Sequence, residues 1–129
     1  MDKKTKTLIS GYIEKSKEKL KTAKNLFKLS LYDDAVSRAY YSAFHAAQAA
    51  LLAEGLNAST HQGLIGLFSL HFIKSGKIDK RFGKFLAELK DDRERGDYEI
   101  YSNLDKQAAA RSIREADLFF KEVASLLKN

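Results

Sequence analysis

The sequence of 129 residues contains neither cysteine nor proline. Without cysteine the chain forms no disulfide, no thiolate metal site and no thiol nucleophile, and we expect it in the reducing cytoplasm. Proline is frequent at turns and in linkers, so its absence predicts long helices joined by short connections. The most apolar stretch, residues 39–53, is interrupted by Ser42, His45 and Gln48 and is too short to span a bilayer, so we expect no membrane association.

The positive charge is unevenly distributed along the chain. The net charge is +6, and residues 1–30 hold nine lysines against three acidic residues, whereas the remainder is electrically balanced. A basic excess permits an anionic partner without requiring one. We therefore interpret the lysines of the first segment as a solvated surface that steers such a partner, and we expect the functional site in the balanced remainder.

Apolar residues recur every three or four positions in five segments and nowhere alternate as in a strand. The sequence therefore predicts one all-α domain over residues 1–129, an up-and-down bundle of four to five antiparallel helices. The second helix is rich in alanine and apolar around most of its circumference, so we expect it at the centre. The predicted helices span residues 3–29, 33–54, 60–74, 79–95 and 104–128.

Short polar residues and glycines predict where these helices begin and end. The expected caps are Asp33 or Asp34 for the second helix, Thr60 for the third and Asn103 or Asp105 for the fifth. A cap at residue 60 puts His61 at a helix N-terminus, where anions bind. Glycines are expected to follow the ends of the second, third and fourth helices, at Gly55, Gly76 and Gly96.

A line of polar residues runs along the otherwise apolar second helix. It consists of Asp34, Arg38, Tyr41, His45 and Gln48, spaced by four, three, four and three residues, which is one helical face. The first two have the spacing of an intrahelical ion pair, which the tyrosine and histidine would extend into a hydrogen-bonded network. The stripe is either a satisfied seam against another helix or a dimer partner, or part of a ligand-binding cleft.

A second polar segment, residues 91–98, ends the fourth helix and enters the longest loop. Arg93 and Arg95 could hold a phosphate with paired hydrogen bonds, and Asp97 could orient a hydroxyl or accept a proton. The ordinary alternative is a helix end with a complementary charge, a glycine and surface ion pairs.

Metal and cofactor motifs are absent from the sequence. The three histidines are ten and sixteen residues apart, which is not the spacing of paired ligands, so we expect no metal site. There is no phosphate-binding loop, no dinucleotide-binding fingerprint and no zinc finger, and we expect no cofactor. No helix pair has the pattern of a helix-turn-helix, so we expect no sequence-specific reading of DNA.

Three segments stand out in order along nearly the whole chain: RAYYSAFHAA at 38–47, THQG at 60–63 and RERGDY at 93–98. Together they resemble the HEPN superfamily, most closely its small standalone prokaryotic branch. The resemblance implies a homodimeric helical bundle, often encoded beside a minimal nucleotidyltransferase in a toxin–antitoxin-like pair. It also implies a kinship with metal-independent endoribonucleases, in which an arginine near the end of a late helix is followed, after four to six residues, by a histidine. In some members the partner enzyme adenylylates a nearby tyrosine.

This sequence departs from that signature. Arg93 fits the arginine position, but Asp97 and Tyr98 stand where the histidine would be, and an aspartate cannot supply an imidazolium. Arg38 and His45 have the spacing but lie on the second helix, so the catalytic assignment is not transferred to them.

Three interpretations follow from these residues. The first is a binding module for a nucleotide, RNA or a nucleotidyltransferase partner. The second is a ribonuclease toxin with a variant site, in which His45 or His61 supplies the proton-transfer group. The third is a non-catalytic dimeric scaffold. The candidate catalytic residues are Arg93, Asp97, Tyr98 and His45, and the candidate nucleotide- or RNA-binding residues are Arg38, Tyr41, His45, His61, Arg93, Arg95, Asp97 and Tyr98.

Overall fold

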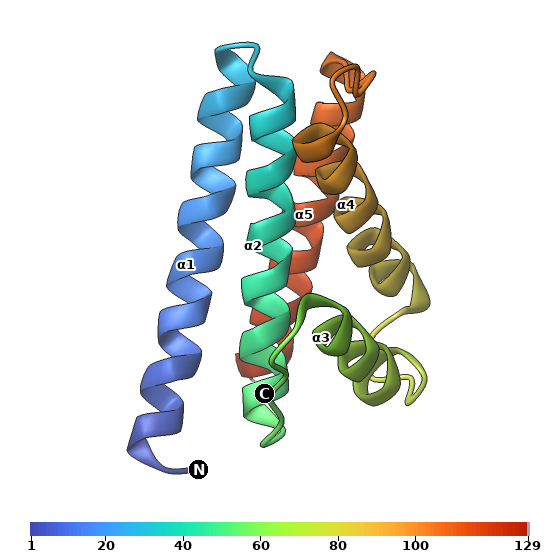
Figure 1. Cartoon of the computed structure of the whole chain (residues 1–129). Helices are drawn as coiled ribbons and strands as arrows, with labels where there is room; N and C mark the ends of the chain where they lie inside the picture. Colours follow the sequence, from blue (N-terminus) through green and yellow to red (C-terminus); the bar gives the residue numbers. More distant parts are fainter. Residues whose placement is uncertain (129) are drawn as a thin grey trace.

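The computed structural model describes residues 1–128, and helices account for most of this part of the chain (Figure 1). They are α1 (Lys3–Lys28), α2 (Tyr32–Ala53), α3 (His61–Phe68), α4 (Lys80–Tyr98) and α5 (Lys106–Lys128), with a π-helical turn, η1 (Ser69–Ile73), continuing α3. No strand occurs among the described residues, so the all-α prediction is confirmed.

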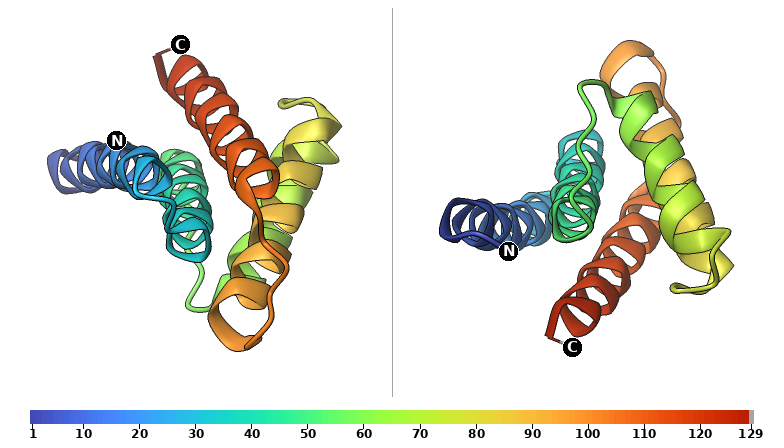
Figure 2. Two further views of the ribbon diagram at one scale, coloured as in Figure 1. Left: turned by 90° about the horizontal axis from the view of Figure 1, so that it is seen from above. Right: turned by 90° about the horizontal axis from the view of Figure 1, so that it is seen from below.

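The four long helices alternate in direction, as predicted for an up-and-down bundle (Figure 1). Viewed from either end, α1 lies at one side of the molecule beside α2, whereas α3 and α4 lie at the opposite side (Figure 2). The short α3 crosses obliquely between α2 and α4, and α4 is itself inclined to the others (Figure 1). Because α2 packs against α1, α3, α4 and α5, it is the central helix, as its composition predicts.

Small side chains allow this close packing around α2. Because the alanine side chain is small, neighbouring helices can approach the α2 backbone closely. Alanine also loses no rotamer freedom when it is buried. The fully buried alanines of α2 are Ala35, Ala39, Ala43, Ala46, Ala47, Ala49 and Ala50. Larger rings fill the space between α3, η1 and α5, where Phe68 stacks on Phe72 and contacts Phe119, with ring centres 5.1 and 5.2 Å apart.

Two serines fix the register of α1 against α2. Ser16 Oγ donates to the Ser42 carbonyl oxygen at 2.7 Å, and Ser42 Oγ donates to the Ser16 carbonyl oxygen at 2.9 Å. Both side chains are completely buried. Since a buried hydroxyl must be hydrogen-bonded, sliding one helix along the other would leave these groups unsatisfied.

The ends of the helices test the predicted caps. Gly55 and Gly76 have φ angles of +73° and +82°, as expected for glycines that follow a helix. Asp105 is confirmed as the cap of α5, because its Oδ1 accepts from the backbone N–H of Ala108 at 2.9 Å.

Two predicted ends are wrong. α2 begins at Tyr32 without a side-chain cap, because neither candidate aspartate occupies the capping position and Asp33 instead accepts from the hydroxyl of Ser102 at 2.8 Å. Gly96 does not end α4, which continues to Tyr98. This glycine provides space rather than a turn, because a Cβ there would lie 3.0 Å from Leu104 Cδ1 and 3.4 Å from Asp33 Cβ.

In the described part of the chain, every helix is too short or too polar to cross a membrane.

Candidate functional site

The predicted polar stripe lies along one side of α2, but its two halves differ. Asp34 and Arg38 are exposed, whereas Tyr41, His45 and Gln48 are half-buried. In residues 1–128 the first two form no ion pair with each other, so the predicted pair is wrong. Two exposed charges gain little from pairing, because water solvates each of them well.

The second half of the stripe is ordered by side-chain contacts. His45 Nδ1 lies 2.7 Å from Gln48 Oε1, and because the amide oxygen only accepts, the imidazole donates through Nδ1. The other ring nitrogen, Nε2, therefore keeps its lone pair in the neutral imidazole. The His45 ring also lies nearly parallel to the ring of Tyr12 on α1, with ring centres 6.0 Å apart.

Arg93 reaches this stripe from α4. Its Nη1 donates to the Tyr41 hydroxyl at 3.0 Å, and its guanidinium carbon lies 5.3 and 5.4 Å from the ring centres of Tyr40 and Tyr41. Asp97 Oδ2 is 3.3 Å from Nε but outside hydrogen-bonding geometry, so the buried Nε has no hydrogen-bond partner. The side chain is only 12% exposed. A largely buried cation is thus held by two aromatic rings and one carboxylate.

His61 joins the same cluster from the first turn of α3. Thr60 caps this helix as predicted, because its Oγ1 accepts from the backbone N–H of Gly63 at 2.9 Å. The cap fixes the turn that places the His61 ring on Phe44, with centres 4.3 Å apart and an angle of 20° between the rings. Its Nδ1 lies 2.8 Å from the hydroxyl of Tyr40.

The hydroxyl of Tyr40 determines the protonation of His61. Burial raises the pKa of Tyr40 well above its ordinary value, so this phenol keeps its proton. Because Nδ1 is the one hydrogen-bond partner of this buried hydroxyl among the described residues, the O–H donates a hydrogen bond to Nδ1. The neutral imidazole then carries its own proton on Nε2. Desolvation, followed by the charges of Arg93 and Lys90, lowers the pKa of His61.

The pKa of His45 is also lowered. Desolvation is the main cause, opposed by the hydrogen bond to Gln48 and reinforced by the charges of Lys15 and Lys19 on α1. Burial alone would lower the pKa of Arg93, but the oxygens of Tyr41 and Asp97 hold it above its ordinary value. At neutral pH the cluster therefore contains one fixed cation and two neutral imidazoles.

We call the surface formed by Tyr41, His45, His61 and Arg93 the Arg93 face. The Tyr41 ring lies between the two histidines, with ring centres 6.2 Å from His45 and 5.8 Å from His61. The stripe on α2 and the end of α4 thus meet, as the sequence suggested.

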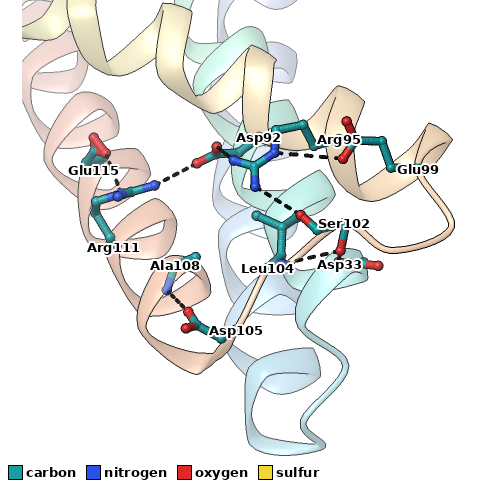
Figure 3. A network of polar contacts seen from close by, with 10 residues as sticks. All are labelled: Asp33, Asp92, Arg95, Glu99, Ser102, Leu104, Asp105, Ala108, Arg111 and Glu115. Carbon is teal, nitrogen blue, oxygen red and sulfur yellow. Dashed lines mark hydrogen bonds and ion pairs between the residues drawn. The ribbon is translucent and has the colours of Figure 1, made fainter.

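Arg95 lies in a different environment, although it is only two residues from Arg93. Its Nη2 donates to the Ser102 carbonyl oxygen at 2.9 Å, and its Nη1 lies 3.4 Å from Asp92 Oδ1 (Figure 3). The other oxygen of Asp92 accepts from Arg111 of α5 at 3.0 Å. Arg93 and Arg95 point to different sides of α4, as residues two apart on a helix do, so they do not lie together as the predicted phosphate clamp requires.

The remaining candidates lie at the edge of the Arg93 face. Asp97 is partly exposed and touches it through Arg93. The Tyr98 side chain is 75% exposed, although its hydroxyl contributes to the raised pKa of Arg93. In residues 1–128 no group of three or more histidine, aspartate or glutamate side chains is arranged to hold a metal ion.

Sequence reasoning missed two contributors, Tyr40 and Phe44, and placed both in the apolar core. Tyr40 is fully buried and Phe44 is 9% exposed. A useful signal was available for the tyrosine, since a buried hydroxyl requires a partner and α2 alone offers none. Its partner, His61, lies 21 residues away in the sequence.

Comparison with known proteins places this geometry in a family. The model of the HEPN domain matches residues 9–126. The chain belongs to the HEPN family. Three relatives cover most of its length.

A Methanocaldococcus jannaschii protein named "Putative toxin MJ0605" is 38% identical over 93% of this chain and 89% of its own. The Thermotoga maritima "UPF0332 protein" is 33% identical over 95% and 92% of the two chains. A second M. jannaschii protein, "Putative toxin MJ0142", is 29% identical over 98% and 86%.

The structure of this HEPN chain bears on the missing signature histidine. The residues that follow Arg93 at that spacing provide a carboxylate, Asp97, and an exposed phenol, Tyr98. Two imidazoles nevertheless lie beside the Tyr41 ring, whose hydroxyl accepts from Arg93, one from α2 and one from α3. The signature histidine is therefore absent from the sequence after Arg93, whereas histidines from two other helices lie in the same cluster.

Proposed function

We propose that this HEPN chain is the toxin-like member of a two-protein pair and that it binds RNA on the Arg93 face. The family and the names of the relatives support the toxin-like part of this proposal. The partner proposed is a minimal nucleotidyltransferase, and the proposed assembly is a homodimer. The single observation that carries RNA binding is the largely buried Arg93, which lies against the rings of Tyr40 and Tyr41 and close enough to His61 to lower its pKa.

The chemistry of the Arg93 face suits a phosphodiester. A guanidinium binds phosphate oxygens through several N–H donors, and one donor of Arg93, Nε, has no hydrogen-bond partner. The neutral His61 offers a further N–H at Nε2. Asp97 is the one carboxylate paired with Arg93 among the described residues, and its side chain is partly exposed. A phosphate that displaces Asp97 would therefore interact with an Arg93 charge that no other carboxylate in residues 1–128 neutralises.

The aromatic rings favour a nucleic acid over a simple phosphate. Tyr41 and His45 are half-buried, and the Tyr41 ring lies against the guanidinium of Arg93. Unpaired bases stack on such rings, and stacking does not require a particular base. Single-stranded RNA therefore matches both the charge and the rings.

Fluorescence anisotropy with a labelled single-stranded RNA tests this proposal. We expect Arg93→Gln to weaken binding at least tenfold, because it removes the cation held against the rings of Tyr40 and Tyr41. Arg114→Gln is the matched control, since it removes an exposed arginine from α5. Equal affinity of the two variants would contradict RNA binding on the Arg93 face.

Sedimentation and co-purification test the proposed assembly. We expect the isolated chain to sediment as a dimer. We also expect it to co-purify with the nucleotidyltransferase encoded beside it. A monomer that retains no such partner would contradict this part of the proposal, while leaving RNA binding to its own test.

A second candidate function is metal-independent cleavage of RNA, favoured by the opposite tautomers of the two histidines. His45 keeps a lone pair on Nε2, whereas His61 carries a proton on Nε2. In this reaction His45 takes the proton of the ribose 2′-hydroxyl as the O2′–P bond forms and the P–O5′ bond breaks. Water protonates the leaving O5′, Arg93 neutralises the phosphoryl oxygens, and His61 donates a hydrogen bond to one of them.

Incubation of the purified protein with RNA in the presence of EDTA distinguishes cleavage from binding. The binding proposal predicts intact RNA. The ribonuclease candidate predicts 2′,3′-cyclic phosphate ends that disappear in His45→Ala and Arg93→Gln but persist in the control, Arg114→Gln.

A further inference from the structure

Helix α1 presents a second set of basic and aromatic side chains beside the Arg93 face. Tyr12, Lys15 and Lys19 are spaced by three and four residues, which puts them on one side of the helix. The Tyr12 ring lies nearly parallel to that of His45, at an angle of 19°. Both lysines are close enough to His45 for their charges to lower its pKa.

In the described part of the chain these two lysines are unpaired, as are most lysines of α1, whereas Lys17 and Lys24 lie close to carboxylates. Lys17 lies 3.7 Å from Glu14, and Lys24 lies 3.9 Å from Asp117. Within residues 1–128, neither Lys15 nor Lys19 forms an ion pair. Their charges are therefore neutralised only by solvent ions, which a polyanion would displace.

The register of the two helices aligns this set with the stripe on α2. Ser16 lies opposite Ser42 in an antiparallel pair, so Lys19, three residues further along α1, lies level with the turn of α2 that carries Arg38. Arg38 is exposed. Basic groups thus continue from Arg93 on α4, across α2, to α1.

We propose that Tyr12, Lys15 and Lys19 form a second subsite, which extends the Arg93 face across α2 and makes its ligand a single RNA strand of several nucleotides. This inference rests on the proposed RNA binding. Lys15 and Lys19 contact phosphates, and Tyr12 with His45 stacks a base.

The dimensions of the bundle support a strand rather than a mononucleotide. Packed helices lie about 8–10 Å apart, so a path from α4 over α2 to α1 is roughly 16–20 Å long. One nucleotide cannot contact both ends of such a path. A short strand can contact Arg93 with one phosphate and the lysines of α1 with later ones.

Paired lysine variants test the subsite. The test variant is Lys15→Gln with Lys19→Gln. The matched control is Lys17→Gln with Lys21→Gln, which removes the same charge from the same helix about 200° away around its axis. The probes are an eight-nucleotide RNA and adenosine monophosphate.

We expect the test variant to bind the eight-nucleotide RNA roughly tenfold more weakly at about 0.1 M salt, and the slope of log K against log salt to fall by about 1.4, since each phosphate contact to a single strand contributes about 0.7. Affinity for adenosine monophosphate should stay unchanged, and the control should bind both probes almost as the natural protein does. Equal loss in the two lysine variants would overturn the subsite, because the effect would then follow net charge.

Tyr12 is tested separately. Tyr12→Phe keeps the ring and should bind the RNA as the natural protein does, whereas Tyr12→Leu should bind it about fivefold more weakly or worse, because one stacked base is lost. Equal binding by these two variants would remove the stacking role.

The Arg93→Gln variant separates this inference from the proposed function. If Arg93→Gln binds as the natural protein does, RNA binding on the Arg93 face is wrong and the subsite falls with it. If Arg93→Gln loses binding while both lysine variants bind equally, the proposed function stands and the second subsite alone is wrong.

Discussion

Arg93 and Arg95 stand two residues apart on α4 in opposite chemical situations. Arg95 is 43% exposed, yet it contacts two carboxylates and a backbone carbonyl at 2.9–4.0 Å. Arg93 is only 12% exposed, yet its contacts are a phenol, two ring faces and one partly exposed carboxylate. The more buried cation therefore has the weaker set of partners.

This difference supports the proposal that Arg95 is a structural arginine whereas Arg93 binds a ligand. On the Arg95 side, the hydrogen bonds close the connection between α4 and α5 and tie it to the start of α2 through Ser102 and Asp33 (Figure 3). A substitution that removes these hydrogen bonds would lower the free energy of unfolding. On the Arg93 side, burial without full neutralisation leaves binding energy that an anion can recover.

Exchanging each arginine for methionine should separate the two roles completely. We expect Arg93→Met to lose RNA binding roughly 100-fold or more with little change in the free energy of unfolding, because a methionine packs well between the rings. We expect Arg95→Met to keep RNA binding and lose about 1–2 kcal/mol of stability, since the carbonyl of Ser102 and one oxygen of Asp92 lose their donor. Fluorescence anisotropy measures the binding and urea unfolding measures the stability. Lost stability in Arg93→Met together with lost RNA binding in Arg95→Met would contradict the proposed roles.

Glu115 lies in the same network of polar contacts as Arg95 (Figure 3), and it should make the stability of the protein depend on pH. Desolvation, followed by repulsion from Glu88, raises the pKa of Glu115 to about 7. Its folded-state pKa exceeds the unfolded value near 4.5, so its contribution to stability is complete below pH 4.5 and is lost as the pH rises through 7. Glu115→Gln removes this loss and should stabilise the protein by about 1–3 kcal/mol at pH 8.

Unfolding in urea at pH 4 and pH 8 checks this prediction. The advantage of Glu115→Gln should be confined to the higher pH. Glu122→Gln on the same helix is the control, and it should show no comparable difference between the two pH values. An equal gain at both pH values would mean that the carboxyl is not neutral in the fold at low pH.

The smallest expected effect concerns the link between Tyr40 and His61 on the Arg93 side. Tyr40→Phe removes the hydrogen bond to His61 Nδ1, so we expect a loss of about 1 kcal/mol in the free energy of unfolding and a rise in the pKa of His61. The shift of the imidazole resonance with pH measures this pKa, and Tyr101→Phe, at an exposed position, is the control. An unchanged pKa would mean that the hydroxyl does not determine the tautomer.

Periodicity predicts which residues of one helix share a face, and it did so for α2. Tyr41 and His45 lie on one side of that helix as expected. Periodicity cannot predict which other helix supplies the partner, and the contact between Arg93 and Tyr41 joins residues 52 positions apart. The same limit explains why Tyr40 looked like an ordinary core residue.

One wrong prediction concerns a residue with more than one physical use. A glycine at the end of an apolar pattern predicts a helix end at Gly96, which would use its backbone freedom, whereas the fold uses its missing side chain to bring α4 close to Leu104.

The Arg93 face also depends on the absence of a side chain at Gly63, in the first turn of α3. A Cβ on Gly63 would lie 2.8 Å from Thr60 Oγ1 and would force that hydroxyl to rotate away from the N–H it caps. A lost cap costs about 1 kcal/mol and loosens the first turn of α3. That turn carries His61. A methyl group at residue 63 would therefore weaken the stacking of the His61 imidazole on Phe44, although the methyl group itself contacts no residue of the Arg93 face. A side chain at residue 63 would therefore disturb the proposed site through the helix cap rather than through a direct contact.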